Sequence, residues 1–207
     1  LPNNDERVEM YKLYLNGMIL PDNLSYSVLS ERTAGVSGAD IANIANQSKI
    51  NAIKKGNNVK TLTESNIQEA IDEILIGREK RERLLSKEER IRVAHHEAGH
   101  CFMGYVLENC DQPIKVSIIP RGEAALGFSQ QKPNNKKLMT KDEVLSRISV
   151  LLGGRSAEKV FFDNVSTGAS DDIEKISMLI KNYSDNWGMN KNIGPLNLRI
   201  LDDLGSN

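Results

Sequence analysis

His96-Glu97-Ala98-Gly99-His100 decides the structure around it, because two of the chain's three histidines lie four residues apart with a glutamate after the first. On an α-helix this spacing places both imidazoles on one face, where they can bind a single metal ion. Zinc prefers imidazole and carboxylate ligands, and a catalytic zinc leaves one position to water, whose pKa it lowers to about 7. Glu97 can take a proton from that water and pass it to the leaving amine. The pentapeptide therefore predicts His96 and His100 as zinc ligands and Glu97 as the catalytic acid and base.

The residues around this pentapeptide predict a long, half-buried helix. Ser86 and Glu89 form a capping box, so the helix should begin near Lys87. No proline follows until Pro113, and apolar residues recur at helical spacing, namely Ile91, Ala94, Ala98, Cys101, Phe102, Tyr105 and Val106. A rigid pair of ligands belongs inside such a helix. The alternative interpretation is that the histidines and the glutamate are ordinary polar residues of a surface helix.

Length and composition limit the classes of function. The chain has 207 residues, 39% of them apolar and 27% charged, which is typical of a soluble globular protein of one or two domains. Its 27 basic and 28 acidic side chains nearly cancel, so we expect no nucleic acid partner. Cys101 and Cys110 are too few for a disulfide framework. No run of 18 apolar residues and no signal peptide occurs, so this part should not span a membrane. Because it begins with leucine, we expect it to be a piece of a longer protein.

The sequence predicts a mainly α-helical fold with a small β-sheet. Helices are expected over residues 7–16, 26–32, 38–56 and 64–74, and Gly77 with the charged run that follows indicates a linker over residues 77–86. After the motif helix, residues 114–119 and 126–131 are typical of two strands, with a turn at residues 120–122. A helix capped by Thr140 should run through Leu152, followed by two glycines and a short segment to Phe162. A last helix follows Ser170.

A zinc ion bound by two histidines needs a third protein ligand. His95 is a poor candidate because it points about 100° away from His96 on the helix. On the last helix Asp172 lies about 60° from the centre of the apolar face, whereas Asp171 lies about 160° away and should face solvent. Both acids could also be present because the helix dipole favours them there. Glu158 remains a rival ligand to Asp172.

Four segments, in this order, resemble those of FtsH-type membrane-anchored AAA proteases. They are Val93-Ala-His-His-Glu-Ala-Gly-His100, Lys115-Val-Ser-Ile-Ile-Pro-Arg-Gly122, Leu151-Leu-Gly-Gly-Arg-Ser-Ala-Glu158 and Val165-Ser-Thr-Gly-Ala-Ser-Asp-Asp172. Gly35-Val-Ser-Gly-Ala-Asp40 is similar to the signature of the helical lid of the AAA ATPase domain. The resemblance covers nearly the whole chain, and Gly77 falls where that family has a glycine hinge.

The resemblance implies a helical lid over residues 1–76, a hinge over 77–86 and a zinc metallopeptidase domain over 87–207, with the last helices of that domain expected outside the chain. It further implies that His96, His100 and Asp172 bind zinc, that Glu97 is catalytic, and that Gly38 and Ala39 lie near bound nucleotide. Residues 126–131 resemble the strand to which an extended substrate adds by backbone pairing.

The resemblance also implies a parent that this chain represents only in part. No Gly-rich phosphate loop ending in Gly-Lys-Ser/Thr occurs, so the ATPase core that binds ATP and Mg²⁺ should lie outside it. The parent would be a homo- or hetero-hexamer that degrades unfolded or membrane proteins. It would be anchored in the bacterial plasma membrane, the mitochondrial inner membrane or the chloroplast thylakoid. The alternative is a non-catalytic zinc-binding scaffold, against which the intact Glu97 argues.

Overall fold

The computed structural model of the chain describes residues 1–58, 60–79, 85–120, 126–132, 138–198 and 200. It divides into two compact units. Unit 1 is Leu1–Leu84 with Ile119–Leu126 and Lys132–Asn135, and unit 2 is Leu85–Ile118 with Gly127–Gln131 and Lys136–Asn207. Helices dominate both units, and the strands of the described residues form one small sheet, so the expected mainly α-helical class is confirmed. Half of the expected hinge, residues 80–84, and the expected turn after Pro120 lie outside the described residues.

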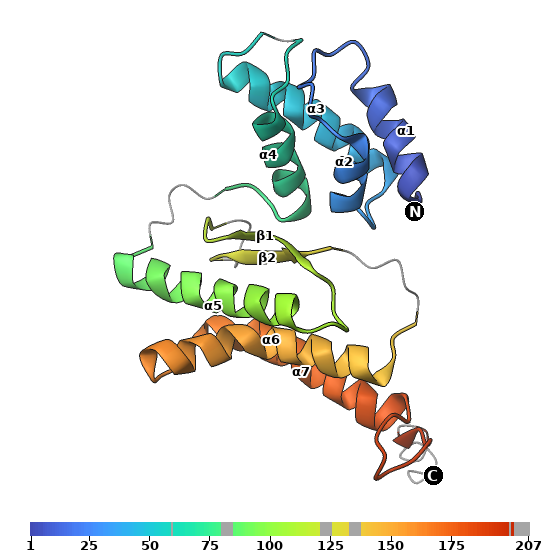
Figure 1. The fold of residues 1–207 in the computed structure, drawn as a ribbon, viewed down its shortest axis with the longest axis vertical. Coiled ribbons are helices and arrows are strands. Elements are labelled where there is room, and N and C mark those ends of the chain that lie inside the picture. The colour runs from blue at the N-terminus through green and yellow to red at the C-terminus, as the bar shows by residue number, and fades with distance from the viewer. Residues whose placement is uncertain (59, 80–84, 121–125, 133–137, 199, 201–207) are drawn as a thin grey trace. The chain divides into compact units, whose positions relative to one another are not determined.

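Unit 1 is built from four helices, labelled in Figure 1 as α1 (Asn4–Tyr14), α2 (Tyr26–Arg32), α3 (Gly38–Lys54) and α4 (Glu64–Leu75). Each begins after a capping side chain that accepts a hydrogen bond from a backbone amide of the first turn. α1 begins three residues earlier than expected, because Asn3 and Glu6 form a capping box. The helices enclose a hydrophobic core of Tyr11, Leu15, Leu29, Val36, Ile41, Ile44, Ala45, Ala52, Leu62, Ile67, Ala70 and Ile71.

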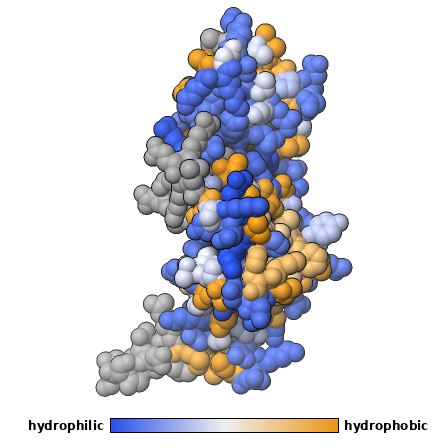
Figure 2. Space-filling view, turned by 90° about the vertical axis from the view of Figure 1, so that its left-hand side faces the viewer, coloured by the Kyte–Doolittle hydropathy of each residue, from blue (hydrophilic) through white to orange (hydrophobic). Residues whose placement is uncertain are grey.

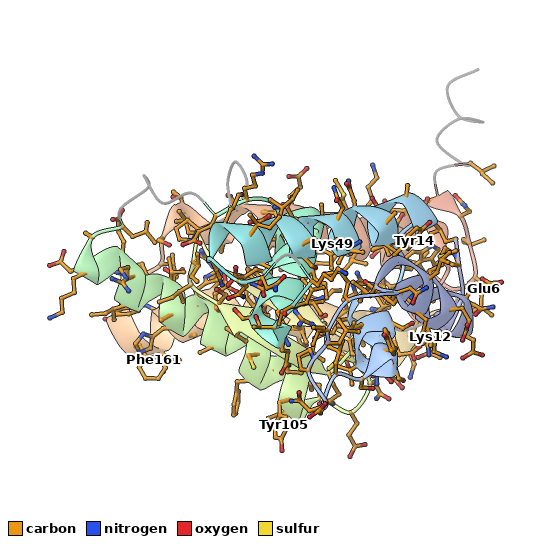
Figure 3. The ribbon with its side chains drawn as sticks, turned by 90° about the horizontal axis from the view of Figure 1, so that it is seen from above. Glu6, Lys12, Tyr14, Lys49, Tyr105 and Phe161 are labelled. Carbon is orange, nitrogen blue, oxygen red and sulfur yellow. The ribbon has the colours of Figure 1, made fainter. Side chains whose placement is uncertain are left out.

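Polar contacts in unit 1 tie the helices together both inside the core and at the surface. The hydroxyl of Tyr11 donates a hydrogen bond to Thr33 Oγ1 at 3.1 Å. Burial of this phenol raises the pKa of Tyr11 to about 12, although the hydrogen bond to Thr33 opposes the shift. At the surface, Lys49 Nζ of α3 donates to the carbonyl oxygen of Tyr14 at the end of α1, at 3.1 Å, and Figure 3 shows these two residues near one another.

Unit 2 places a small sheet on one side of α5 (Lys87–Val106) and α6 (Lys141–Phe162) on the other (Figure 1). The antiparallel strands β1 (Pro113–Ser117) and β2 (Phe128–Gln131) pair with Ser117 opposite Phe128, and both are shorter than expected. α7 (Ser170–Lys181) packs on α6 and continues into a π-helical turn, Asn182–Asn186. The predicted caps of α5 and α6 are both formed.

Helix α6 differs from expectation because it continues through Gly153 and Gly154 to Phe162. A Cβ atom at Gly99 of α5 would overlap the carbonyl oxygen of Gly153. The backbones of α5 and α6 therefore approach more closely than any side chain allows, and this contact compensates for the low helix propensity of glycine.

The interior of unit 2 holds few apolar side chains. Among the described residues of this unit, its buried hydrophobic residues are Val144, Val150, Ala169 and Ile176. Other apolar residues face outward: Tyr105 and Phe161 are 74% and 64% exposed, and Figure 3 shows both pointing away from the ribbon. Figure 2 likewise shows hydrophobic residues among hydrophilic ones at the surface. None of the described helices is both long enough and apolar enough to cross a lipid bilayer.

Candidate metal centre

Three side chains from two helices of unit 2 converge on one point. His96 and His100 lie one turn apart on α5 and their Nε2 atoms are 3.0 Å apart. Asp172, in the first turn of α7, places Oδ2 3.2 Å from each of these nitrogens. The three donor atoms all lie within 4.8 Å of one another, and they are the one such group of three found among the described residues.

Each imidazole is fixed through its other nitrogen. His96 Nδ1 lies 2.9 Å from Glu158 Oε1, and His100 Nδ1 lies 2.8 Å from the carbonyl oxygen of Val150. A carbonyl oxygen can only accept, so Nδ1 of His100 carries the proton and Nε2 is left with a free lone pair. A carboxylate at His96 Nδ1 selects the same tautomer. Two imidazole nitrogens and one carboxylate oxygen aimed at one point are a donor set that fits zinc and leaves a fourth position.

Gly154 provides the space in front of the two imidazoles. A Cβ atom on this residue would lie 2.5 Å from His96 Nε2 and 2.6 Å from His100 Nε2. A distance this short is well inside van der Waals contact, so any larger residue would displace the histidines. Gly154 is thus required by the candidate metal site, whereas Gly153 is required by the close contact between α5 and α6.

Glu97 follows the first histidine and is buried beside the cluster, 8% exposed. Its side chain lies against the backbone of Gly127, where a Cβ atom would come within 2.9 Å of Glu97 Oε1. Burial raises the pKa of Glu97, and the nearby charge of Asp172 raises it further, although the two histidines oppose the shift. The carboxyl group of Glu97 therefore lies next to Gly127, the residue that precedes β2.

The electrostatics of the cluster follow from the hydrogen bonds between its members. Burial is the largest single effect on the pKa of His96 and of His100 and lowers it, but contacts with Asp172, with Glu158 at His96 and with the Val150 carbonyl at His100 together outweigh burial, and the pKa of each imidazole is raised. Burial raises the pKa of Asp172, yet hydrogen bonding to both histidines holds it far below its usual range. Asp172 is therefore an ionised, negatively charged donor, as a cation requires.

The other candidates of the sequence analysis lie elsewhere. Glu158 is not in the cluster, because its oxygens bind His96, Arg92 and Ser166. His95 turns away and packs on Phe161 and Phe162 of α6, with ring centroids 4.5 and 5.1 Å apart. Asp171 is exposed and pairs with Lys175. Gly38 and Ala39 lie in the first turn of α3, in unit 1, where the nearest contact of a Cβ on Gly38 would be the side chain of Met10 at 3.4 Å.

Two features of this site were missed by reasoning from the sequence. The role of Val150 cannot be found there, because its backbone carbonyl is the acceptor and any residue has one. Glu158 was considered only as a ligand, although it lies one helical turn after Gly154 and so on the same face of α6. That spacing indicates that Glu158 can orient a histidine ligand through the ring nitrogen that does not face the metal position.

The chain matches two known protein families and several named relatives. The family model described as "Peptidase family M41" matches residues 83–205, and that of the "AAA+ lid domain" matches residues 23–69. A Rhodothermus marinus protein named ATP-dependent zinc metalloprotease FtsH is 37% identical over 204 residues, which is 99% of this chain and 29% of the relative.

Two further relatives give the same result. A Helicobacter pylori protein of the same name is 40% identical over 91% of this chain and 30% of its own length. The Arabidopsis thaliana protein named ATP-dependent zinc metalloprotease FTSH 3, mitochondrial, is 38% identical over 98% of this chain and 25% of its own length. The chain thus spans less than a third of these relatives. Because the peptidase model covers more than half of it, the chain belongs to peptidase family M41.

Proposed function

We propose that this chain is the lid and peptidase part of an ATP-dependent zinc endopeptidase. Residues 1–76 would form the lid, residues 77–86 the hinge and residues 87–207 the peptidase domain. The observation that carries the proposal is the convergence of two histidine nitrogens and one carboxylate oxygen beside a buried glutamate. The names of the relatives, all zinc metalloproteases, favour this function over a non-catalytic zinc-binding scaffold.

His96, His100 and Asp172 would hold the zinc ion, with Glu158 keeping His96 in its binding orientation. When bound, zinc supplies Lewis-acid chemistry: it polarises a peptide carbonyl and lets water ionise near neutral pH. Glu97 accepts the proton of the attacking water at a carboxylate oxygen and delivers it to the leaving amine. Its burial keeps competing water away from that oxygen.

An extended substrate would lie along β2. β1 covers one edge of β2, and among the described residues no strand pairs with the other edge. A substrate that adds there is held by backbone hydrogen bonds, which depend little on its side chains. Gly127 at the start of this edge lies against Glu97, so a peptide bound there would reach the proton-transfer group. Such binding suits unfolded chains, including unfolded membrane proteins.

The remaining functions would belong to the parent protein. Its ATPase core would bind ATP and Mg²⁺, with Gly38 and Ala39 near the nucleotide, and would drive substrate to the peptidase unit. The parent would be a homo- or hetero-hexamer anchored in the bacterial plasma membrane, the mitochondrial inner membrane or the thylakoid membrane. Nucleic acid is not expected as a partner, because the charges of the chain nearly cancel.

The test compares zinc content and ATP-dependent cleavage of an unfolded protein by the full-length parent and its Glu97→Gln variant. Glu97→Gln should keep its zinc and lose at least 100-fold in cleavage rate, the lower range expected for removal of a general acid and base. Glu88→Gln is the matched control, because Glu88 is exposed on the same helix, and it should cleave normally. Equal cleavage by wild type and a zinc-loaded Glu97→Gln would refute the mechanism.

A further inference from the structure

We infer that Arg92 is a positioning residue of the metal centre, which acts on the ligand His96 through Glu158. The inference rests on the proposed zinc function, and it concerns how one ligand is kept in place. Glu158 is only 1% exposed, and its Oε1 atom binds the Nδ1 atom of His96, on the side of the ring away from Nε2.

Glu158 receives four hydrogen bonds, two at each oxygen. His96 Nδ1 at 2.9 Å and Ser166 Oγ at 3.0 Å bind Oε1. Arg92 Nη1 at 3.1 Å and the backbone N–H of Ser166 at 2.8 Å bind Oε2. A carboxylate offers about four lone-pair sites, so its capacity is filled and neither oxygen can rotate without breaking two bonds. Arg92 and Ser166 together thus determine where Oε1 points.

Among the side chains that the described residues place against Glu158, only Arg92 is permanently charged. A buried carboxylate is costly unless it is paired with a cation and hydrogen-bonded. His96 and Arg92 are the cationic partners that the described residues give Glu158. A histidine that binds zinc is neutral, however, and Ser166 donates only neutral hydrogen bonds. In the zinc-bound protein Arg92, whose guanidinium stays protonated in proteins, is therefore the cationic side chain in direct contact with Glu158, while the charge of zinc would act from the opposite ring nitrogen of His96.

Arg92 is itself held in position. Its guanidinium carbon lies 4.5 Å from the centroid of the Phe162 ring, a cation–π arrangement. Arg92 precedes His96 by one turn of α5, and Phe162 follows Glu158 by one turn of α6, so two i, i+4 pairs face each other across the helix contact. The guanidinium is thus fixed from one side by the aromatic ring and reaches Oε2 from the other.

Removal of the guanidinium should loosen His96 without removing any ligand. Glu158 would keep its bonds to Ser166 but lose the group that balances its charge, and its Oε1 atom would no longer be held toward His96 Nδ1. Loss of a group that orients a metal-bound histidine costs about 10–100-fold in metal affinity. Because Arg92 acts one contact further away, we expect about 10-fold weaker zinc binding, the lower end of that range.

The experiment measures zinc dissociation constants of the full chain by competition with a chromogenic chelator. Arg92→Met should bind zinc about 10-fold more weakly, and Glu158→Gln at least as weakly. The double variant should be no weaker than Glu158→Gln alone, because the two residues act in series. Arg90→Met is the matched control, an exposed arginine on the same helix, and should bind zinc as the wild type does.

A second measurement separates positioning from folding. The nitrogen-15 resonances of the His96 ring should change in Arg92→Lys, because lysine keeps the charge but not the planar fork over Phe162. This variant should also bind zinc more tightly than Arg92→Met, and it serves in place of Arg92→Met if the latter does not fold. Unchanged His96 resonances with unchanged zinc affinity in Arg92→Lys would overturn the inference.

Two further outcomes would refute the role of Arg92 without refuting zinc binding at this site. Arg92→Met could bind zinc as Arg90→Met does while Glu158→Gln is weakened, or the losses of the two single variants could add in the double variant. The proposed function fails differently: in that case wild type and His100→Ala would bind zinc equally well.

Discussion

Replacement of Gly154 by alanine should weaken zinc binding strongly while leaving the fold intact. The new Cβ atom would lie 2.5 and 2.6 Å from the Nε2 atoms of His96 and His100, and an ordinary contact needs about 3.5 Å. Each imidazole must therefore move by about 1 Å, whereas metal–ligand distances tolerate only about 0.2 Å. The movement also breaks the Nδ1 hydrogen bonds that fix the rings. We expect zinc affinity to fall by at least 100-fold, as for the loss of more than one orienting contact.

The stability of Gly154→Ala should change much less. When both proteins are compared without zinc, overpacking costs about 1–3 kcal/mol and the better helix propensity of alanine returns about 1 kcal/mol, so the net loss of stability is at most about 2 kcal/mol. Zinc per chain after desalting and the thermal midpoint from circular dichroism separate the two effects. Gly104→Ala is the matched control on α5, because its Cβ would meet Pro113 Cδ at 3.4 Å and leaves the site untouched. One zinc bound to Gly154→Ala with wild-type affinity would show that this glycine does not make room for the metal.

Other parts of the molecule make further predictions. The pKa of Tyr11 is about 12 in the folded state and about 10 in the unfolded state. The free energy of unfolding of unit 1 should therefore fall by up to about 3 kcal/mol between pH 10 and 12, and should not change for this reason below pH 10. In urea unfolding, Tyr11→Phe should not show this fall. Gly99→Ala should destabilise unit 2 by about 1–3 kcal/mol in the same assay, because its Cβ meets the backbone of Gly153. Asp172→Asn should release zinc completely, whereas Glu158→Gln should retain it with lower affinity; equilibrium dialysis that gave the opposite order would reverse their roles. Zinc at 100 times its dissociation constant should stabilise unit 2 by about 2.7 kcal/mol and leave unit 1 unchanged, as measured by protection of amide hydrogens from exchange.

Local patterns predicted the parts of the fold that depend on neighbouring residues. The capping boxes that begin at Ser86 and Thr140 lie where expected, because a cap involves only four residues of chain. The same locality accounts for the spacing of His96 and His100 on one face. The earlier start of α1 has the same local cause, because the capping box of Asn3 and Glu6 begins the helix at Asn4.

Features that depend on distant contacts were not predictable in this way. Two adjacent glycines disfavour a helix locally, and the expected end of α6 followed from that rule. The helix continues because Gly153 and Gly154 each meet a specific part of α5. Glu158 was equally ambiguous, because a buried acid can bind a metal or orient a ligand. Only its contacts with His96 and Ser166 distinguish these roles.

Each unit is stabilised by a different kind of interior. This difference links the metal site to the stability of unit 2. Unit 1 encloses a continuous hydrophobic cluster, which can stabilise it without any ligand. In unit 2 much of the interior between α5, α6 and α7 consists of His96, Glu97, His100 and Glu158, and the helices approach through glycines instead of interlocking side chains. Such a polar interior is favourable only when its hydrogen bonds and charges are all satisfied. Asp172 is charged and points at two nitrogens, so a bound cation would complete the set. The metal would then hold α5 and α7 together, as the apolar core does for the helices of unit 1. Metal binding would therefore also stabilise the folded peptidase unit.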